Sequence, residues 1–158
     1  MKINWKKDIF SSTYQLSSNH ESVGELKEKV FSNSTKAELF GVKIKFSKSD
    51  FFSSEVKIID RTLNQEIGKI KFNAWGNKAV ISLNGAKFQW QYEKFWASMW
   101  QITRNGIVVC RYKSKTSRGS IESTVKDEAL ILTGLFIYNH YLKITMMVVM
   151  FIVLFTST

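Results

Sequence analysis

The C-terminal segment of the chain constrains the fold more than any other feature. Residues 144–155 hold one polar side chain, Thr145, in twelve positions, and from Met146 onward the run is apolar on every face of a helix. A helix that is apolar all round has to be enclosed, either by protein or by lipid. As a helix, residues 135–155 would extend about 32 Å at 1.5 Å per residue.

Three arrangements satisfy this segment, and the sequence leaves them open. In the first, which we expect, residues 135–156 form a helix threaded through a barrel of strands. In the second, the same residues anchor the chain in a membrane with Lys143 reaching toward the interface, although the clean apolar run is shorter than the about 20 residues of a spanning helix. In the third, the segment forms two buried strands, which its β-branched side chains favour: Val148, Val149, Ile152 and Val153.

Most of the preceding chain alternates between apolar and polar side chains, the pattern of strands packed on a core from one side. Asn84-Gly85 and Asn105-Gly106 each separate two such segments and can supply the left-handed residues of a type I′ hairpin turn. Further turns are predicted at Gly76-Asn77, at Arg118-Gly119 and over residues 62–65. The predicted strands cover residues 9–16, 26–31, 42–46, 56–59, 68–74, 78–84, 88–92, 96–103, 107–112, 120–125 and 129–132.

This pattern predicts a mainly β chain: an antiparallel β-barrel of about 10–12 strands enclosing a hydrophobic C-terminal helix. About eight strands fill a barrel with their own side chains, whereas more strands leave a hole that an all-apolar helix can fill. No repeat period and no linker is evident in the residues. We therefore expect a single barrel domain over residues 1–158, with residues 135–156 as its central helix.

The composition points to an anionic partner and away from catalysis. Lys and Arg number 23 against 13 Asp and Glu, a net charge of +10 that attracts anionic surfaces. The single cysteine, Cys110, can form neither a disulfide framework nor a cysteine zinc site. His20 and His140 are the two histidines, and no nucleophile elbow or phosphate-binding glycine loop is present. We predict no enzymatic activity, no metal and no cofactor.

The N-terminal residues carry positive charge without an apolar stretch after it, so they do not resemble a secretory signal. The expected location is the cytoplasm. The alternative is attachment to a membrane through residues 135–156.

One group of basic residues is a candidate ligand site. Arg111, Lys113, Lys115 and Arg118 lie within eight residues that contain no acid. On a strand, the first three share one face at a spacing of about 7 Å, and with Arg118 they could clamp phosphates. Lys69 and Lys71 form a further outward pair. The alternative is that these charges only keep an exposed sheet face soluble.

Several segments together resemble the tubby-like superfamily, which groups the tubby proteins, the phospholipid scramblases and the plant LURP-one-related proteins. The similarity covers about residues 37–156. The segments that carry it are Ile59-Asp60-Arg61, Glu66-Ile67-Gly68-Lys69-Ile70, Ala74-Trp75-Gly76-Asn77-Lys78-Ala79, Ser117-Arg118-Gly119-Ser120-Ile121-Glu122 and Ala129-Leu130-Ile131-Leu132-Thr133-Gly134-Leu135-Phe136.

The resemblance implies a barrel of about twelve strands around a C-terminal helix, and an association with membrane lipid. The chain lacks the cysteine-rich stretch and the calcium-loop acids of the scramblases, so lipid scrambling is not expected. We therefore expect a non-enzymatic barrel that binds anionic phospholipid, or another anionic ligand, through basic strand faces.

Two alternatives remain open. One is a tail-anchored membrane protein with a cytoplasmic β-domain. The other is nucleic-acid binding, which would require exposed aromatic rings on the basic strands to stack on bases. The alternation places these rings in the core instead: Trp90, Tyr92, Trp96 and Trp100.

Overall fold

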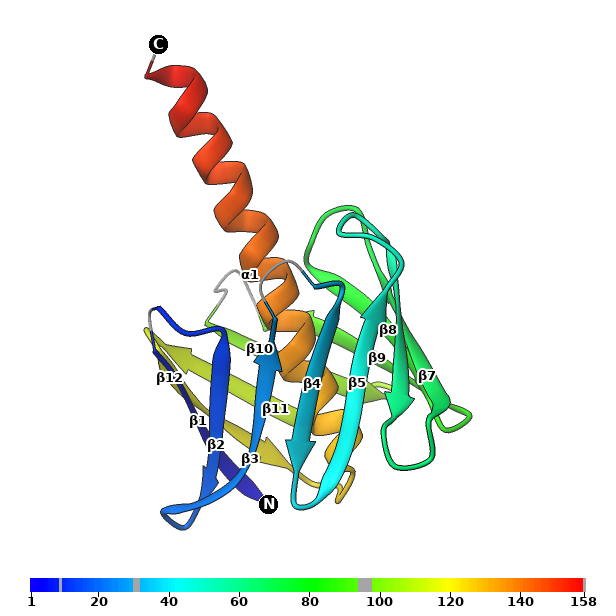
Figure 1. Ribbon diagram of the computed structural model, residues 1–158. Coiled ribbons are helices and arrows are strands. Elements are labelled where there is room, and N and C mark those ends of the chain that lie inside the picture. Colours follow the sequence, from blue (N-terminus) through cyan, green and yellow to red (C-terminus); the bar gives the residue numbers. More distant parts are fainter. Residues whose placement is uncertain (9, 30–31, 94–97, 158) are drawn as a thin grey trace.

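The computed structural model describes residues 1–8, 10–29, 32–93 and 98–157. Within them, twelve antiparallel strands form a closed barrel, and one helix, α1 (Glu128–Thr156), runs through the barrel and out at one end (Figure 1). Each strand pairs with its neighbours in the chain, and β1 closes the barrel on β12. The strands are β1 (Lys2–Lys7), β2 (Thr13–Ser18), β3 (Glu21–Glu28), β4 (Ser34–Leu39), β5 (Val42–Lys48), β6 (Glu55–Asp60), β7 (Gln65–Phe72), β8 (Lys78–Leu83), β9 (Ala86–Tyr92), β10 (Met99–Arg104), β11 (Ile107–Lys115) and β12 (Arg118–Ser123).

The predicted fold class is confirmed, and so are its two strongest turns. Asn84 and Gly85 have φ angles of 48° and 80°, and Asn105 and Gly106 have 50° and 77°, as a type I′ turn requires. The turn predicted at Arg118-Gly119 is wrong. Both residues belong to β12, and the chain reverses just before them, where Thr116 has a φ of 59°.

The strands near the N-terminus were only partly predicted. β1 and β4 were missed, because each is short and carries only two inward apolar side chains. Ile9, Phe31 and Trp96, which the predicted strands included, lie outside the described residues.

The helix begins earlier than the sequence suggested. The predicted strand over residues 129–132 is wrong, because these residues form the first turn and a half of α1. Asp127 caps the helix by accepting a hydrogen bond from the Leu130 amide (3.0 Å), and Glu128 places a negative charge in the first turn. A segment that is apolar on every side shows no period, so only these capping signals mark its helical start.

The barrel encloses the first half of α1, from Ala129 to Tyr141. The Gly134 carbonyl accepts hydrogen bonds from the indoles of Trp90 (3.0 Å) and Trp100 (3.2 Å). Tyr112 donates to the Ile131 carbonyl (2.9 Å) and is fully buried. These polar tips of large inward side chains therefore find their partners on the helix, which fixes its depth in the barrel.

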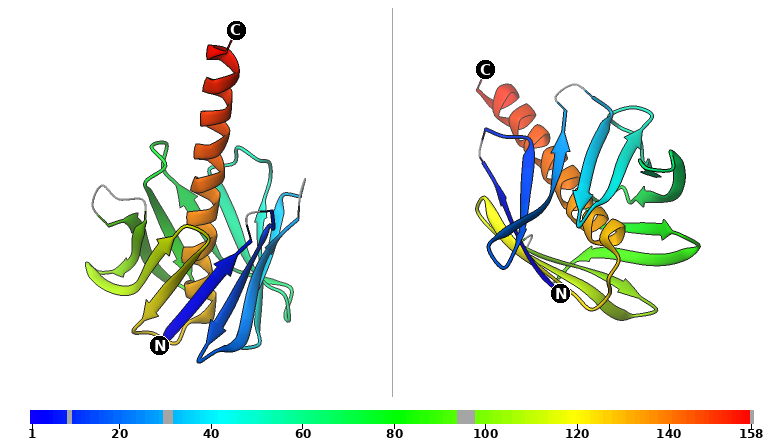
Figure 2. Two further views of the ribbon diagram at one scale, coloured as in Figure 1. Left: turned by 90° about the vertical axis from the view of Figure 1, so that its left-hand side faces the viewer. Right: turned by 60° about the horizontal axis from the view of Figure 1, so that its bottom comes forward.

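The second half of α1 projects from the barrel, as the views in Figure 2 show. Each of residues 148–154 is between 53% and 64% exposed. The prediction that residues 135–156 form the enclosed helix is thus correct for residues 135–141 and wrong for residues 144–155. The most apolar part of the sequence is the part that the barrel does not cover.

The register of the sheet reveals a threefold internal repeat that the residues alone do not show. The units β1–β4, β5–β8 and β9–β12 each carry a register shift in their second strand, after Leu16, Ile58 and Ile102. In each unit, that residue is paired with a large buried ring on the first strand, namely Trp5, Phe46 and Trp90. The equivalence lies in pairing geometry and residue size, and little in residue identity.

Candidate functional site

The end of the barrel where α1 leaves, which we call the exit end, is formed by the ends of the odd-numbered strands and the starts of the even-numbered ones. Contacts with the helix locate it. Lys48, the last residue of β5, reaches His140, and Glu28, the last residue of β3, pairs with Lys143. On the far side, the Tyr141 hydroxyl donates to the carbonyl of Lys78 at the start of β8. The opposite end carries most of the two-residue turns in the described part of the chain, and we call it the turn end.

A group of polar side chains surrounds the helix at the exit end. The Lys48 ammonium donates to Nδ1 of His140 (2.9 Å), whose ring stacks on Phe72 at a centroid distance of 4.0 Å. Burial, with the nearby charges of Lys48 and Lys143, lowers the pKa of His140 to about 3, so the ring is neutral at pH 7.

Three lysines lie at this mouth together with the carboxylate of Glu28. Burial lowers the pKa of Lys48, and the charge of Lys143 lowers it further. Burial also lowers the pKa of Lys7 on β1. Glu28 forms a salt bridge with Lys143, and no salt bridge among the described residues involves Lys7 or Lys48. Two lysines, Lys7 and Lys48, therefore lie immediately below the exposed half of the helix without a salt bridge to any described acid.

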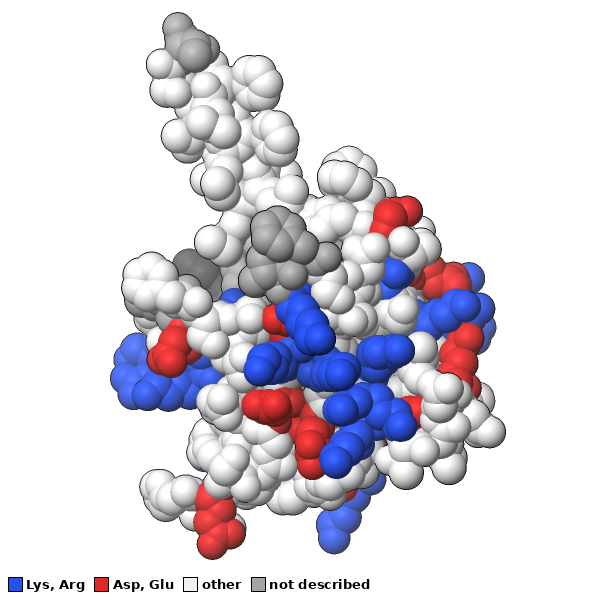
Figure 3. All heavy atoms as spheres, in the orientation of Figure 1, with Lys and Arg blue, Asp and Glu red and all other residues white. Residues whose placement is uncertain are grey.

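A second basic site lies on the outer wall near the same end. A groove of about 630 Å³ between β1, β10, β11 and β12 is lined by four basic side chains, which define the basic groove: Lys6, Lys113, Lys115 and Arg118. Arg118 is the cross-strand neighbour of both Lys6 and Lys115. No salt bridge in the described part of the chain involves any of the four. The blue spheres at the left edge of Figure 3 belong to this part of the wall.

The structure brings together three of the six residues predicted to bind an anion. Lys113, Lys115 and Arg118 share the basic groove, whereas Arg111 lies farther along β11 and pairs with Glu93 (3.0 Å). Lys69 and Lys71 are on β7, in another part of the wall, and Lys69 pairs with Glu55 (3.5 Å) and Glu66 (3.8 Å). Lys6 was missed, because only the closure of β1 on β12 places it beside Arg118.

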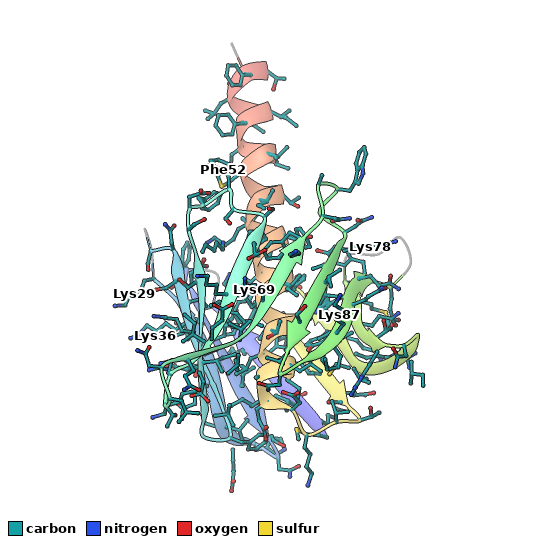
Figure 4. All side chains as sticks on the ribbon, turned by 90° about the vertical axis from the view of Figure 1, so that its right-hand side faces the viewer. Lys29, Lys36, Phe52, Lys69, Lys78 and Lys87 are labelled. Atoms are coloured by element: carbon teal, nitrogen blue, oxygen red, sulfur yellow. The ribbon has the colours of Figure 1, made fainter. Side chains whose placement is uncertain are left out.

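A row of lysines crosses the wall on β3, β4 and β5. Lys36 pairs directly with Lys27 on one side and with Lys45 on the other, and these three residues define the lysine row. Like charges directly opposite each other destabilise a sheet. The row belongs to the large blue area at the centre of Figure 3, and Figure 4 shows Lys36 and Lys69 pointing outward.

Other chemistry is limited. No cluster of His, Cys, Asp and Glu that could hold a metal ion occurs among the residues described. Burial raises the pKa of the Cys110 thiol, which opposes a nucleophilic role. Trp90 and Trp100 are fully buried, so neither ring can stack on a nucleic-acid base.

Comparison with known proteins adds no relative. No protein-family model, no curated protein and no solved structure matches the chain. The resemblance to the tubby-like superfamily stays a prediction.

Proposed function

We propose that this protein is a membrane-attached β-barrel whose helix α1 inserts its exposed half into a lipid bilayer. The observation that carries the proposal is the exposure of residues 148–154, a continuous apolar stretch of a helix long and apolar enough to cross a membrane. Burying such side chains stabilises by about 1.5–3 kcal/mol each, so a strong driving force removes them from water.

The shape of the apolar surface favours lipid over a protein groove. A helix that binds in a groove presents one apolar stripe and keeps a polar face in water. Residues 146–155 of α1 offer no polar face at all. Residues 144–155 extend about 18 Å at 1.5 Å per residue, which exceeds half of the about 30 Å hydrocarbon thickness. Lys143 stands just before this stretch, where its ammonium can reach the headgroups.

A second proposed activity is the binding of anionic lipid headgroups by the basic groove. Its support is the convergence of Lys6, Lys113, Lys115 and Arg118 near the end from which the membrane-inserting helix leaves. Arginine and lysine side chains without carboxylate partners suit phosphate groups. A headgroup in the groove would hold one side of the barrel close to the bilayer.

Flotation of the full chain with vesicles tests both proposals. The variant carrying Val149→Lys and Ile152→Lys should no longer float, whereas the Lys87→Glu control on the outer wall should float like the wild type. Flotation of the Val149/Ile152 variant at the wild-type level contradicts insertion.

For the basic groove, the variant carrying Lys115→Glu and Arg118→Glu should keep its binding to neutral phosphatidylcholine vesicles and lose the added affinity for vesicles containing phosphatidylserine. An unchanged preference for phosphatidylserine contradicts the second proposal.

A further inference from the structure

The most exposed aromatic rings among the described residues gather at the exit end. Phe10, in the loop between β1 and β2, is completely exposed, and Phe52 and Trp75 are 85% and 89% exposed. Phe52 lies between β5 and β6, and Trp75 between β7 and β8, so each ring comes from a different loop around the emerging helix. Figure 4 shows Phe52 on its loop at the end of the barrel from which α1 leaves.

The turn end is built differently. Its connections include two-residue turns such as Asn84-Gly85 and Asn105-Gly106. Its most exposed large apolar side chains are aliphatic, Leu63 at 63% and Ile107 at 70%, and the ring of Phe40 is 46% exposed. The exit end thus has exposed aromatic rings in three of its loops, whereas most connections at the turn end are two-residue turns.

This asymmetry matches the layers of a membrane. Aromatic rings concentrate at the boundary between hydrocarbon and headgroups, where an apolar body and a polarisable face are both accommodated. Lysines near that boundary face lipid phosphates. At the exit end, Lys7, Lys48 and Lys143 lie around the emerging helix, and among the described residues only Lys143 forms a salt bridge, with Glu28, so Lys7 and Lys48 are available to lipid phosphates.

We propose that the barrel sits end-on on an anionic phospholipid bilayer, with Phe10, Phe52 and Trp75 in the interfacial layer and the lysines of the mouth against lipid phosphates. The proposal rests on the insertion of α1 and adds the orientation and the depth of the barrel. Because α1 leaves roughly along the barrel axis (Figure 2), insertion of the helix brings all the loops of the exit end toward the membrane surface together.

Depth-dependent quenching of tryptophan fluorescence tests this orientation. The full chain is bound to vesicles of phosphatidylcholine and phosphatidylserine in which the lipid carries bromine at one of several depths, and the Trp75→Phe variant identifies the signal of Trp75. The Trp75 signal should be quenched most by bromine close to the headgroups. As a control, a Trp75→Phe variant that also carries Leu63→Trp moves the reporter to the turn end, where bromine should leave it unquenched.

The outcomes separate this inference from the proposed function. If the protein floats with the vesicles but Trp75 is not quenched, α1 inserts and the end-on orientation is wrong. If the protein does not float at all, both proposals fail. Quenching of the reporter at position 63 to the same extent as Trp75 also overturns the orientation.

Vesicle affinity gives an independent measurement. Phe52→Ser and Trp75→Ser should each weaken binding about tenfold, because each removes one large ring from the interface. Leu63→Ser is the control, since it removes an exposed apolar side chain from the turn end, and it should leave binding unchanged. Equal losses of vesicle affinity for Phe52→Ser and Leu63→Ser would show that the exit end does not face the membrane.

Discussion

Gly134 is the position at which the helix and the barrel are fitted most closely. A Cβ atom built there would lie 2.1 Å from the Tyr112 hydroxyl oxygen and 2.4 Å from Cζ of the same ring. Tyr112 is fully buried and cannot move aside, so Gly134→Ala has to displace the helix. The carbonyl of Gly134 would then lose its hydrogen bonds from the indoles of Trp90 and Trp100.

The expected loss of stability follows from these contacts. Overpacking costs about 1–3 kcal/mol, and each buried indole N–H left without an acceptor costs about 1–3 kcal/mol. Alanine in place of glycine in a helix interior stabilises the helix by about 1 kcal/mol, which offsets part of this loss. The free energy of unfolding of Gly134→Ala should therefore fall by about 3 kcal/mol or more.

Urea unfolding, followed by tryptophan fluorescence in micelles of a non-ionic detergent, measures this difference. The control is Thr145→Ala, on the part of the same helix outside the barrel, which should change the unfolding free energy by less than about 0.5 kcal/mol. If Gly134→Ala unfolds at the same urea concentration as the wild type, the depth of α1 in the barrel is not set by this contact, and our account of the core is refuted.

Three further variants probe other parts of the structure by urea unfolding. The pKa of His140, lowered to about 3 by burial, lies below its ordinary value of 6.5, so the unfolded chain takes up this proton first as the pH falls and stability is lost from about pH 6.5 down toward pH 3. His140→Gln should flatten that part of the stability profile, and an unchanged slope in this variant would exclude His140 as its cause. Lys36→Glu, at the centre of the lysine row, should stabilise the barrel by about 0.5 kcal/mol at low salt, and an equal effect in high salt would exclude electrostatic repulsion as the cause. Asp127→Ala should cost about 1 kcal/mol through loss of the helix cap, and no cost would mean that the cap is dispensable.

The local features of the fold were predictable from the sequence. Side chains that alternate along a segment report directly which face of a strand is buried, and Asn-Gly pairs encode the backbone angles of their turns. The start of α1 was not predictable in this way. The apolar run at residues 129–132 is compatible with a buried strand and with a buried helix, and the capping by Asp127 decides between them.

The candidate sites depend on closure of the barrel, which no local pattern contains. Lys113, Lys115 and Arg118 were found as a cluster because they are close in sequence. Lys6 joins them only because β1 pairs with β12 across the whole chain. Phe10, Phe52 and Trp75 gather at one end for another reason: each follows an odd-numbered strand, and in an antiparallel up-and-down sheet these loops all lie at the same end.

The continuity of α1 has a mechanical consequence. The same helix contacts the indoles of Trp90 and Trp100 at one end and, in our proposal, lipid at the other, with no loop between Glu128 and Thr156 to act as a swivel. Any tilt that a thinner or thicker bilayer imposes on the tail is therefore transmitted as a torque to the centre of the barrel. The packing of the barrel around α1 can therefore respond to the thickness of the membrane that holds the helix.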